Sequence, residues 1–500
     1  MLTDSIHDRA LIESVHPPAW RNPQPQGRYN LVVLGGGTGG LVSAAVAAGL
    51  GARVALIERD KLGGDCLITG CVPSKALIRA GRLASEARGA ASLARPHAAA
   101  PVPDFGVAME RMREIRARIA PNDSAARFRD LGVDVYLGEG RFVARDAIEV
   151  GGTRLSFARA VLATGARASA PPIPGLADAG FLTNESVFSL TQRPARIAVI
   201  GGGPIGCELA QTFARLGVAV TLFEVGSHVL EREDPDAAAI IQNALARDGV
   251  RLVLGASVLC VANSGASRSV RFTAGDAAES MLEVDEILVA AGRAPNVEGI
   301  GLEQAGVTFE RQGIAVDDRL RTTNPRIYAV GDCCMAWKFT HAADAAAKIA
   351  VQNALFFGRK KLSTLVMPWC TYTDPELAHV GISAREAAQR GIPIDTYTVG
   401  LEHVDRAICD GEDEGFVRMH ARKGTDRIAG ATIVASHAGE MLSLVTAAMT
   451  AGIGLGKLAG TIFPYPTQSD AIKAASNQYM RTRLTPGVKR LFETFLRWRR

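Results

Sequence analysis

Two glycine-rich turns, each between an apolar strand pattern and a helix pattern, constrain the fold of this chain most. The first turn carries Gly35, Gly37 and Gly40 directly after the apolar run 30–34, and Glu58 ends the next predicted strand. A short apolar run followed by glycines and an Ala-rich stretch is typical of a strand, a tight turn and a helix. The first 60 residues therefore predict the opening of an α/β domain.

The same pattern returns in the middle of the chain. Gly201, Gly203 and Gly206 follow a second apolar run, and Glu224 ends the strand after the next helix. In both copies the acidic residue lies 23 positions after the first glycine and 18 positions after the third. An internal duplication of one nucleotide-binding unit explains this repeat most simply.

The spacing of these glycines suits a dinucleotide. The first glycine permits a tight turn, the second lets the backbone approach a pyrophosphate, and the third lets helix and strand pack closely. The helix N-terminus then favours the phosphate charge, and the acid accepts hydrogen bonds from a ribose diol. Two glycine turns that bind nothing are the alternative. If the second copy binds the nicotinamide nucleotide, Glu224 would repel a 2′-phosphate and favour NADH over NADPH, although Arg232 nearby opposes this preference.

Composition excludes several other classes. The chain has 500 residues, 47% of them hydrophobic, so it is long enough for about three domains and is not disordered. A net charge of +5 is too small for a broad nucleic-acid surface, and small molecules are the expected partners. The first nine residues lack the apolar core of a secretory signal, so a cytoplasmic location is expected, and we interpret the apolar stretch 441–456 as a buried helix.

Two cysteines follow the first acidic residue closely. Cys66 and Cys71 are five positions apart, just after Gly63 and Gly64, and this spacing allows a disulfide bridge. A zinc half-site is an alternative, but no matching Cys/His pair follows at ligand spacing. Two unreactive buried thiols are the other alternative.

With this segment in view, the sequence resembles the class I pyridine nucleotide-disulfide oxidoreductases, flavoproteins that include mercuric reductase, dihydrolipoamide dehydrogenase and glutathione reductase. The resemblance covers roughly residues 28–480. It rests on the segments 35–40, 66–75, 163–165, 201–208, 292–296 and 323–332.

The resemblance implies an α/β fold with two Rossmann-type, glutathione reductase-like domains and a C-terminal α+β dimerisation domain. The implied organisation is an N-terminal arm 1–27, an FAD domain in two parts 28–170 and 293–361, an NAD(P)H domain 171–292, a dimerisation domain 362–480 and a basic amphipathic tail 481–500. The four prolines within residues 17–25 favour an extended arm.

By the same resemblance, the first fingerprint binds FAD and the second binds NADH, with NADPH possible. Cys71 would be the flavin-side thiol and Cys66 the thiol that meets the substrate, while Lys75 near the flavin would pair with Glu208. A homodimer is implied, with the active site completed by the partner's C-terminal domain. The further residues implied in cofactor binding are Gly64, Thr164, Gly165, Gly292, Arg293, Asp332 and His341.

Two positions near the C-terminus depart from the pattern of the dithiol enzymes. Glutathione reductase and dihydrolipoamide dehydrogenase carry a His-Pro-x-x-x-Glu, where this chain has Tyr465 and Asp470. A phenol with a pKa of about 10 is a poor base at neutral pH, whereas an imidazole near about 6.5 transfers protons readily. Mercuric reductase carries Phe-Pro-Tyr at this place, as this chain does. Its C-terminal cysteine pair is missing here, because no cysteine follows Cys409, and we interpret Cys333 and Cys334 as packing residues.

The sequence therefore predicts an FAD enzyme that passes electrons from NAD(P)H through a Cys66–Cys71 disulfide to a soft acceptor such as Hg(II) or another thiol-bound metal. Dihydrolipoamide dehydrogenase-like chemistry, with Tyr465 and Asp470 as the acid-base pair, is one alternative. A redox-sensing or membrane-tethered flavoprotein with little turnover is the other. No resident metal site is predicted.

The last residues predict an amphipathic helix. Thr485 is a suitable N-cap before a proline, and Val488, Leu491, Phe492 and Phe495 share one helical face. Two interpretations stay open: a helix docked on its own protein, or an interfacial helix that touches acidic lipid or a partner.

Overall fold

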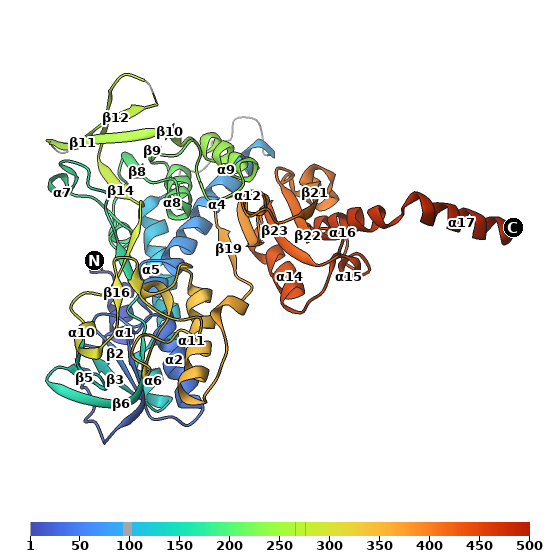
Figure 1. Cartoon of the computed structure of the whole chain (residues 1–500). Coiled ribbons are helices and arrows are strands. Elements are labelled where there is room, and N and C mark those ends of the chain that lie inside the picture. Colours follow the sequence, from blue (N-terminus) through green and yellow to red (C-terminus); the bar gives the residue numbers. More distant parts are fainter. Residues whose placement is uncertain (1, 94–102, 266, 276) are drawn as a thin grey trace. The chain divides into compact units, whose positions relative to one another are not determined.

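The computed structural model describes residues 2–93, 103–265, 267–275 and 277–500. These residues form two compact units (Figure 1). The first unit comprises Met1–Gly201, Thr212–Thr221 and Val258–Leu365, and the second comprises Gly202–Gln211, Leu222–Ser257 and Val366–Arg500.

The first fingerprint belongs to a large sheet in the first unit. The strand order is β3-β2-β1-β6-β5-β4, and β18 also pairs with β6. Leu31, Val32 and Val33 of β1 are fully buried, as expected for a central parallel strand covered on both faces. The strands are β1 (Tyr29–Leu34), β2 (Val54–Glu58), β3 (Val133–Leu137), β4 (Gly140–Ala144), β5 (Ala147–Val150), β6 (Thr153–Leu162) and β18 (Ile327–Ala329).

Small side chains let two helices approach each other beside this sheet. α2 (Thr38–Gly49) follows β1 and packs against α11 (Thr340–Leu355). Ala44 and Ala47 of α2 and Ala346 of α11 are fully buried. β18 and α11 thus return the chain to the sheet that it began, an arrangement that the two-part first domain requires.

The second fingerprint lies in a four-stranded sheet with the order β10-β9-β8-β14. A three-stranded sheet of β11, β12 and β13 follows. The division between the two units falls between Gly201 and Gly202, so the domain boundaries drawn from the sequence stay predictions. The elements are β8 (Arg196–Ile200), α8 (Pro204–Arg215), β9 (Ala219–Glu224), α9 (Pro235–Arg247), β10 (Arg251–Leu254), β11 (Ala256–Ser264), β12 (Ser267–Ala274), β13 (Ser280–Val284) and β14 (Glu286–Val289).

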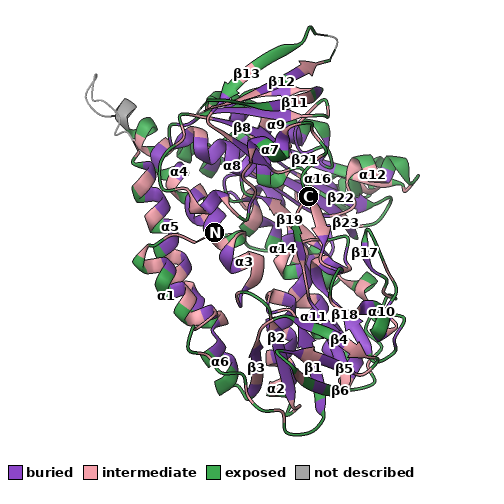
Figure 2. Cartoon of the chain, turned by 90° about the vertical axis from the view of Figure 1, so that its left-hand side faces the viewer, coloured by how far each residue is buried: buried purple, intermediate pink, exposed green. Residues whose placement is uncertain are grey.

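The C-terminal region forms an antiparallel sheet with the order β19-β20-β23-β22-β21, packed against α14 and α16. Buried residues follow its strands in Figure 2, and Met441, Leu442 and Val445 of α14 complete the same core, which confirms a buried helix here. The elements are β19 (Pro368–Thr371), β20 (Glu376–Gly381), β21 (Ile394–Gly400), β22 (Phe416–Arg422), β23 (Ile428–Ala435), α14 (Ala438–Thr450), α15 (Leu455–Ala459) and α16 (Asp470–Arg483).

Other helices and short strands connect these parts. They are α3 (Gly64–Ile68), α4 (Cys71–Leu93), α5 (Phe105–Ile119), α6 (Ala125–Asp130), β7 (Ala166–Ala168), α7 (Leu176–Ala179), β15 (Arg293–Pro295), α10 (Leu302–Ala305), β16 (Phe309–Glu310), β17 (Gly313–Ile314), α12 (Ala384–Gln389) and α13 (Asp405–Asp410). Within the described ranges, no helix is both long and apolar enough to span a bilayer.

The prediction of an extended arm for residues 1–27 is wrong. α1 (Ile6–Val15) packs against α5, and its Leu11 and Val15 are fully buried. Ser5 is the N-cap and accepts a hydrogen bond from the backbone N–H of His7 at 3.2 Å. An N-cap serine followed by apolar residues four positions apart favours a helix, a signal that the prolines after it outweighed in the prediction.

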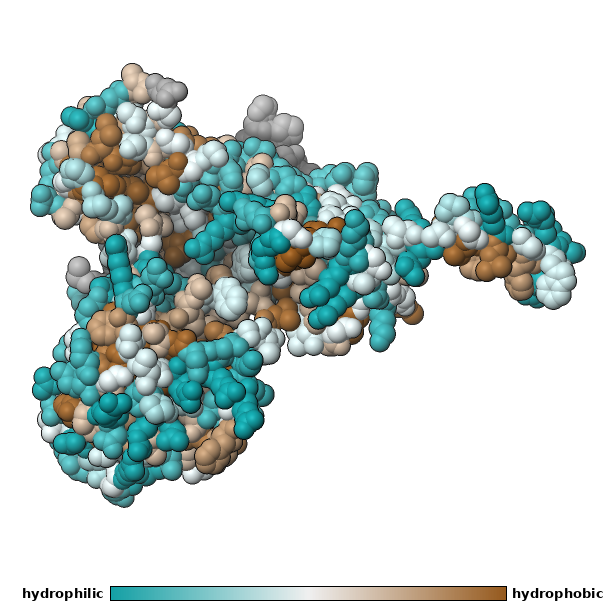
Figure 3. All heavy atoms as spheres, viewed as in Figure 1, coloured by the Kyte–Doolittle hydropathy of each residue, from teal (hydrophilic) through white to brown (hydrophobic). Residues whose placement is uncertain are grey.

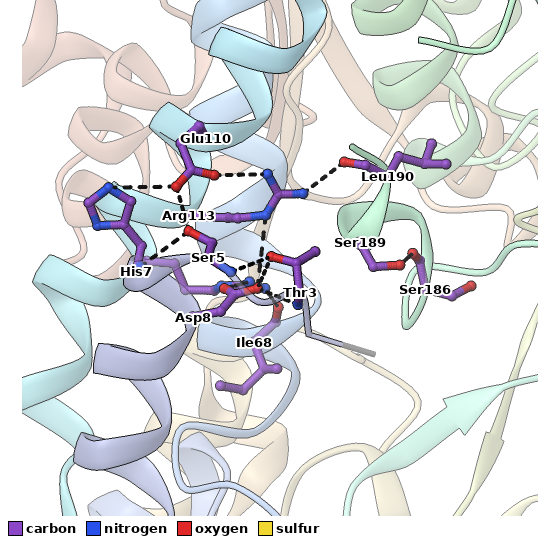
Figure 4. Close-up of polar contacts among 11 residues, drawn as sticks. Thr3, Ser5, His7, Asp8, Ile68, Glu110, Arg113, Ser186, Ser189 and Leu190 are labelled. Carbon is purple, nitrogen blue, oxygen red and sulfur yellow. Dashed lines mark hydrogen bonds and ion pairs between the residues drawn. The ribbon is translucent and has the colours of Figure 1, made fainter. Parts of the chain in front are cut away.

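A buried ion network holds α1 against α5 (Figure 4). Asp8 is only 1% exposed, and its carboxylate accepts a hydrogen bond from Arg116 at 2.6 Å, with Arg113 at 3.9 Å. Arg116 also donates to the carbonyl oxygen of Ile68 at 2.7 Å. Since Ile68 lies between Cys66 and Cys71, the N-terminal helix is linked through one guanidinium to the backbone of the cysteine segment.

The last helix does not dock on its own chain. α17 (Pro486–Trp498) starts at the N-cap Thr485, whose hydroxyl accepts a hydrogen bond from the N–H of Val488. All its residues are exposed except Val488, which is half-buried. The helix is confirmed, and the interpretation that it packs on its own protein is wrong for the described chain.

Candidate active site

The first fingerprint needs glycine for steric reasons. Gly35 has φ +108°, and a Cβ there would lie 2.3 Å from the carbonyl oxygen of Ala163. A Cβ on Gly40 would lie 1.8 Å from the carbonyl oxygen of Gly35. The N-cap of α2 is Gly37, which offers no side-chain cap. The backbone N–H groups at this helix start therefore face no side chain of their own N-cap, and a phosphate group suits them.

The two acidic residues make matching contacts. Glu58 accepts hydrogen bonds from the backbone N–H of Gly36 at 2.6 Å and of Asp60 at 2.7 Å. Burial raises the pKa of the Glu58 carboxyl, and the two backbone hydrogen bonds oppose that rise. Each carboxylate oxygen retains a further lone pair, so a ribose hydroxyl fits beside these contacts.

Glu224 repeats this arrangement in the second copy. It accepts hydrogen bonds from Gly202 N–H at 2.6 Å and from Gly226 N–H at 2.8 Å. Gly201 has φ +112°, close to the value of its counterpart Gly35. There is open space beside Gly203, because a Cβ there would meet no atom within 4 Å. Gly206, the third glycine of the motif, is buried. The duplication seen in the sequence thus extends to backbone conformation and hydrogen bonding.

The cysteine segment lies against the first fingerprint. Gly63 and Gly64 have φ +94° and +55°, and a Cβ on Gly64 would lie 2.7 Å from the Cα of Gly37. This close approach fixes the start of α3, which carries Cys66. Cys71 is the first residue of α4. The segment that carries both cysteines therefore begins beside the first glycine turn.

The two thiols interact directly. Both cysteines are free, Cys66 half-buried and Cys71 exposed, and they share a hydrogen bond. Cys71 Sγ also lies 3.2 Å from the hydroxyl oxygen of Thr340. The hydrogen bond with Cys71 and burial raise the pKa of the Cys66 thiol, and a hydrogen bond with Thr340 lowers it. Sequence reasoning missed the contact of Thr340 with Cys71, which crosses 269 residues.

An arginine joins two carboxylates beside Cys66. Arg293 forms an ion pair with Asp65, the residue before Cys66, and its Nε lies 3.3 Å from Asp332. Burial raises the pKa of Asp332, while the charge of Arg293 opposes the rise. The guanidinium balances the charge of Asp65, an effect that the sequence could not reveal.

Three further predicted cofactor residues, Thr164, Gly165 and Gly292, make hydrogen bonds to neighbouring loops. Thr164 donates from its hydroxyl to the backbone oxygen of Asn296 at 2.7 Å, and the Asn296 side chain donates back to the Thr164 carbonyl at 2.9 Å. Gly165 has φ +68° and accepts from the backbone N–H of Asn296. Gly292 has φ +151°, and its carbonyl accepts from Ser169.

His341 lies in the first turn of α11. Its ring stacks on Phe339 with the centroids 5.4 Å apart. Since Thr340 of the same turn contacts Cys71, the start of α11 lies beside the two cysteines.

The predicted pair of Lys75 and Glu208 stays a prediction. Lys75 lies one turn after Cys71 on α4. Glu208 is 5% exposed and accepts a hydrogen bond from the backbone N–H of Tyr372 at 2.9 Å.

Tyr465 and Asp470 lie in the C-terminal region. Tyr465 is 75% exposed and its hydroxyl donates to Asp405 at 2.8 Å. This hydrogen bond, together with the charge of Asp405, raises the pKa of the Tyr465 phenol. Asp470 begins α16 and accepts from the N–H of Thr467 at 3.4 Å. Asp405 was not predicted from the sequence, which gives no sign of a contact across 60 residues.

Comparison with known families identifies both halves of the chain. Residues 29–347 match the pyridine nucleotide-disulphide oxidoreductase family, and residues 367–476 match its dimerisation domain. The second match indicates a homodimer.

Individual relatives carry several names. Mercuric reductase of Bacillus cereus is 34% identical over 89% of this chain and 71% of its own length. Dihydrolipoyl dehydrogenase of Chlamydia trachomatis is 33% identical over 88% of this chain and 95% of its own. Among solved structures, the Cu(II) complex of the HOCl-induced flavoprotein disulfide reductase RclA from Escherichia coli has a TM-score of 0.81 and 28% identity, covering 91% of this chain and all of that one. The chain belongs to the class I pyridine nucleotide-disulfide oxidoreductases, with the glutathione reductase-like α/β fold of that family.

Proposed function

We propose that this protein oxidises NADH and uses the two electrons to reduce a Cys66–Cys71 disulfide, which in turn reduces a soft, thiol-bound metal ion such as Hg(II). The observation that carries the proposal is the direct contact of Cys66 with Cys71 next to the first glycine turn. The close contact between the backbones of Gly64 and Gly37 positions the cysteine segment. Two unreactive thiols would not require such positioning. In balance, two electrons and a proton from NADH open the disulfide to one thiol and one thiolate. Two electrons then pass to Hg(II) and give Hg(0), while the disulfide closes again and the thiol proton is released to solvent.

The residues of the first fingerprint fit FAD. The turn leaves no room for a Cβ at Gly35 or Gly40, and its N-cap Gly37 offers no side-chain cap at the start of α2, so the turn forms a cradle that suits a pyrophosphate. Glu58 would hold the ribose and Asp332 the ribitol. Bound FAD would supply two-electron transfer between the nicotinamide and the disulfide.

The chain's own groups favour the thiolate chemistry. Cys71 stands at the N-terminus of α4, where the helix dipole stabilises a thiolate. Thr340 offers a hydrogen bond to both sulfurs. The N-terminus of α11 also carries a partial positive charge, which favours a thiolate nearby.

The acceptor proposal rests on Tyr465. Its phenol donates to Asp405 and its pKa is raised, so it holds its proton at neutral pH and does not act as a base. A dithiol substrate needs such a proton carrier, whereas a metal ion bound by two thiolates does not. This distinction favours the chemistry named for the Bacillus cereus relative over that of the Chlamydia trachomatis relative.

The nucleotide preference rests on Glu224. Its carboxylate is fixed by Gly202 and Gly226, and a 2′-phosphate placed there would meet a negative charge. NADH is therefore the proposed donor.

An acceptor screen tests this function. The flavin-loaded dimer is assayed for NADH oxidation with Hg(II)-thiol complexes, Cu(II)-thiol complexes, lipoamide and a quinone. We expect turnover with a thiol-bound metal that exceeds turnover with lipoamide at least tenfold. Faster turnover with lipoamide would overturn the acceptor assignment, and no turnover with any acceptor would favour a redox sensor.

A further inference from the structure

The C-terminal helix α17 exposes a continuous apolar surface. Leu491 is 66% exposed and Trp498 81%, and the space-filling view shows a brown strip along this helix (Figure 3). The apolar side chains of α17 that are exposed are Leu491, Phe492, Phe495, Leu496 and Trp498. Single exposed apolar residues are common on proteins, whereas five within eight positions of one helix mark a binding surface.

These side chains share one side of the helix. With 3.6 residues per turn, Leu491, Phe492 and Phe495 recur on one face, while Lys489, Arg490 and Arg497 lie on the other. Phe495 and Trp498 lie with their rings 6.1 Å apart. An N-capped helix with such a division is built to lie in an interface between water and an apolar phase.

The charge of this segment sets it apart from the rest of the chain. Residues 481–500 contain seven Lys and Arg and one Glu, a net charge of +6, against +5 for the whole sequence. The other 480 residues together therefore carry a charge of −1. The basic residues are Arg481, Arg483, Lys489, Arg490, Arg497, Arg499 and Arg500.

We propose that α17 attaches the enzyme to a bilayer surface rich in anionic lipid, with the apolar face in the headgroup and acyl boundary and the basic residues among the headgroups. Charge complementarity favours this occupant. A second copy of the segment 481–500 would bring a charge of +6 close to a charge of +6, which opposes self-association. At 13 residues the helix is too short to span a membrane.

Vesicle sedimentation of the full-length, flavin-loaded protein tests the proposal. Vesicles of phosphatidylcholine alone are compared with vesicles that contain about one third phosphatidylglycerol, at low and high salt. We expect at least tenfold more protein in the pellet with the anionic vesicles, and loss of most of it at high salt. Equal pelleting with both vesicles, or none with either, would overturn the proposal.

Variants of the apolar and basic faces of α17, with a control outside this helix, test whether α17 itself binds the vesicles. Leu491→Ser with Phe495→Ser should abolish pelleting, and Lys489→Glu with Arg490→Glu should reduce it at least fivefold. Phe357→Ser removes an aromatic side chain that is 91% exposed outside α17 and should pellet like the unaltered protein. Equal pelleting of all three variants would contradict the assignment to α17.

Removal of residues 485–500 tests whether the apolar face of α17 binds lipid or a second copy of the chain. We expect the truncated protein to keep its flavin, its melting temperature and its activity on soluble acceptors, and to lose vesicle binding. Loss of a higher oligomer on truncation, measured by analytical ultracentrifugation without any vesicle binding, would assign the face to a second copy instead. Since binding is measured without turnover, the result stands apart from the proposed function.

Discussion

The two glycine fingerprints share one skeleton and differ in what surrounds it. Glu58 and Glu224 each fix two backbone N–H groups at 2.6–2.8 Å. In the first copy the cysteine segment presses on the turn, because Gly64 packs on Gly37. The two middle glycines differ accordingly: a Cβ on Gly37 would contact the Cα of Gly64 at 3.8 Å, whereas a Cβ on Gly203 would meet nothing within 4 Å.

This difference matches two kinds of ligand. A turn that is covered by another segment of the chain suits a cofactor that stays bound through many turnovers. A turn with free space around its middle glycine suits a nucleotide that must enter and leave in each cycle. We therefore assign the resident flavin to the first copy and the exchanging NADH to the second, and the following changes test that assignment.

Loss of either thiol should have the largest effect, and only on the chemistry of the first copy. Cys66→Ser or Cys71→Ser should lower kcat/KM for the metal acceptor by about 1,000-fold or more, because one thiol cannot complete a two-electron disulfide cycle. NADH affinity, measured by fluorescence titration, should stay within about twofold. Cys260→Ser, a half-buried thiol of β11, is the control and should remain active. Comparable activity of all three variants would refute the redox role.

The next largest effects are expected from two glycine substitutions, one beside the first turn and one within the second. Gly64→Ala adds a Cβ 2.7 Å from the Cα of Gly37 at φ +55°, and backbone cannot yield as a side chain can. We expect the purified variant to retain less than half of its flavin, measured by absorbance. Gly203→Ala should retain its flavin and raise KM for NADH severalfold. Full flavin in both variants would remove the distinction between the copies.

The acids should give a smaller, selective effect. Glu224→Ala removes the negative charge that opposes a 2′-phosphate and should lower the preference for NADH over NADPH by about tenfold, or about 1.4 kcal/mol. Glu58→Ala should leave this preference unchanged, although it should weaken flavin binding. The measurement is the ratio of kcat/KM for NADH to kcat/KM for NADPH in each variant. An equal change of this ratio in both variants would contradict the assignment of NADH to the second copy.

The pH dependence of Cys66 should give the smallest effect. Its pKa is raised by the hydrogen bond with Cys71 and by burial, so its reactive thiolate is scarce at neutral pH and increases as pH rises. Alkylation of Cys66 in the reduced protein, followed by mass spectrometry, should therefore accelerate at a higher pH than alkylation of an ordinary thiol. Thr340→Val removes a hydrogen bond that lowers this pKa and should move the profile to still higher pH. A profile at lower pH would show that the shift has the opposite sign.

The parts that the sequence predicted correctly are those with local signatures. The glycine and acid spacing and the cysteine segment each lie within short stretches, and they led to the family and the fold. The roles of Lys75 and Glu208 and the domain boundaries stay predictions. Periodicity also predicted α17, since an amphipathic face is visible in the sequence alone.

Contacts across long stretches of sequence could not be predicted. Asp8 with Arg116 spans 108 residues, and Arg293 with Asp65 spans 228. A single sequence contains no signal that pairs one carboxylate with one guanidinium among many. The error in the N-terminal arm is different, because Ser5 and the apolar spacing of α1 are local signals that the prolines outweighed; only the burial of Asp8 against its arginine partners needed the folded chain.

Labelling of Cys66 and Cys71 with and without NADH tests the central claim most directly. The oxidised, flavin-loaded protein is mixed with NADH without oxygen, quenched with an alkylating reagent and analysed by mass spectrometry. The account predicts that both cysteines are unlabelled before NADH and both are labelled after one equivalent per chain, while labelling of Cys409 does not change. Equal labelling of Cys66 and Cys71 with and without NADH would contradict a disulfide that accepts electrons from the nucleotide.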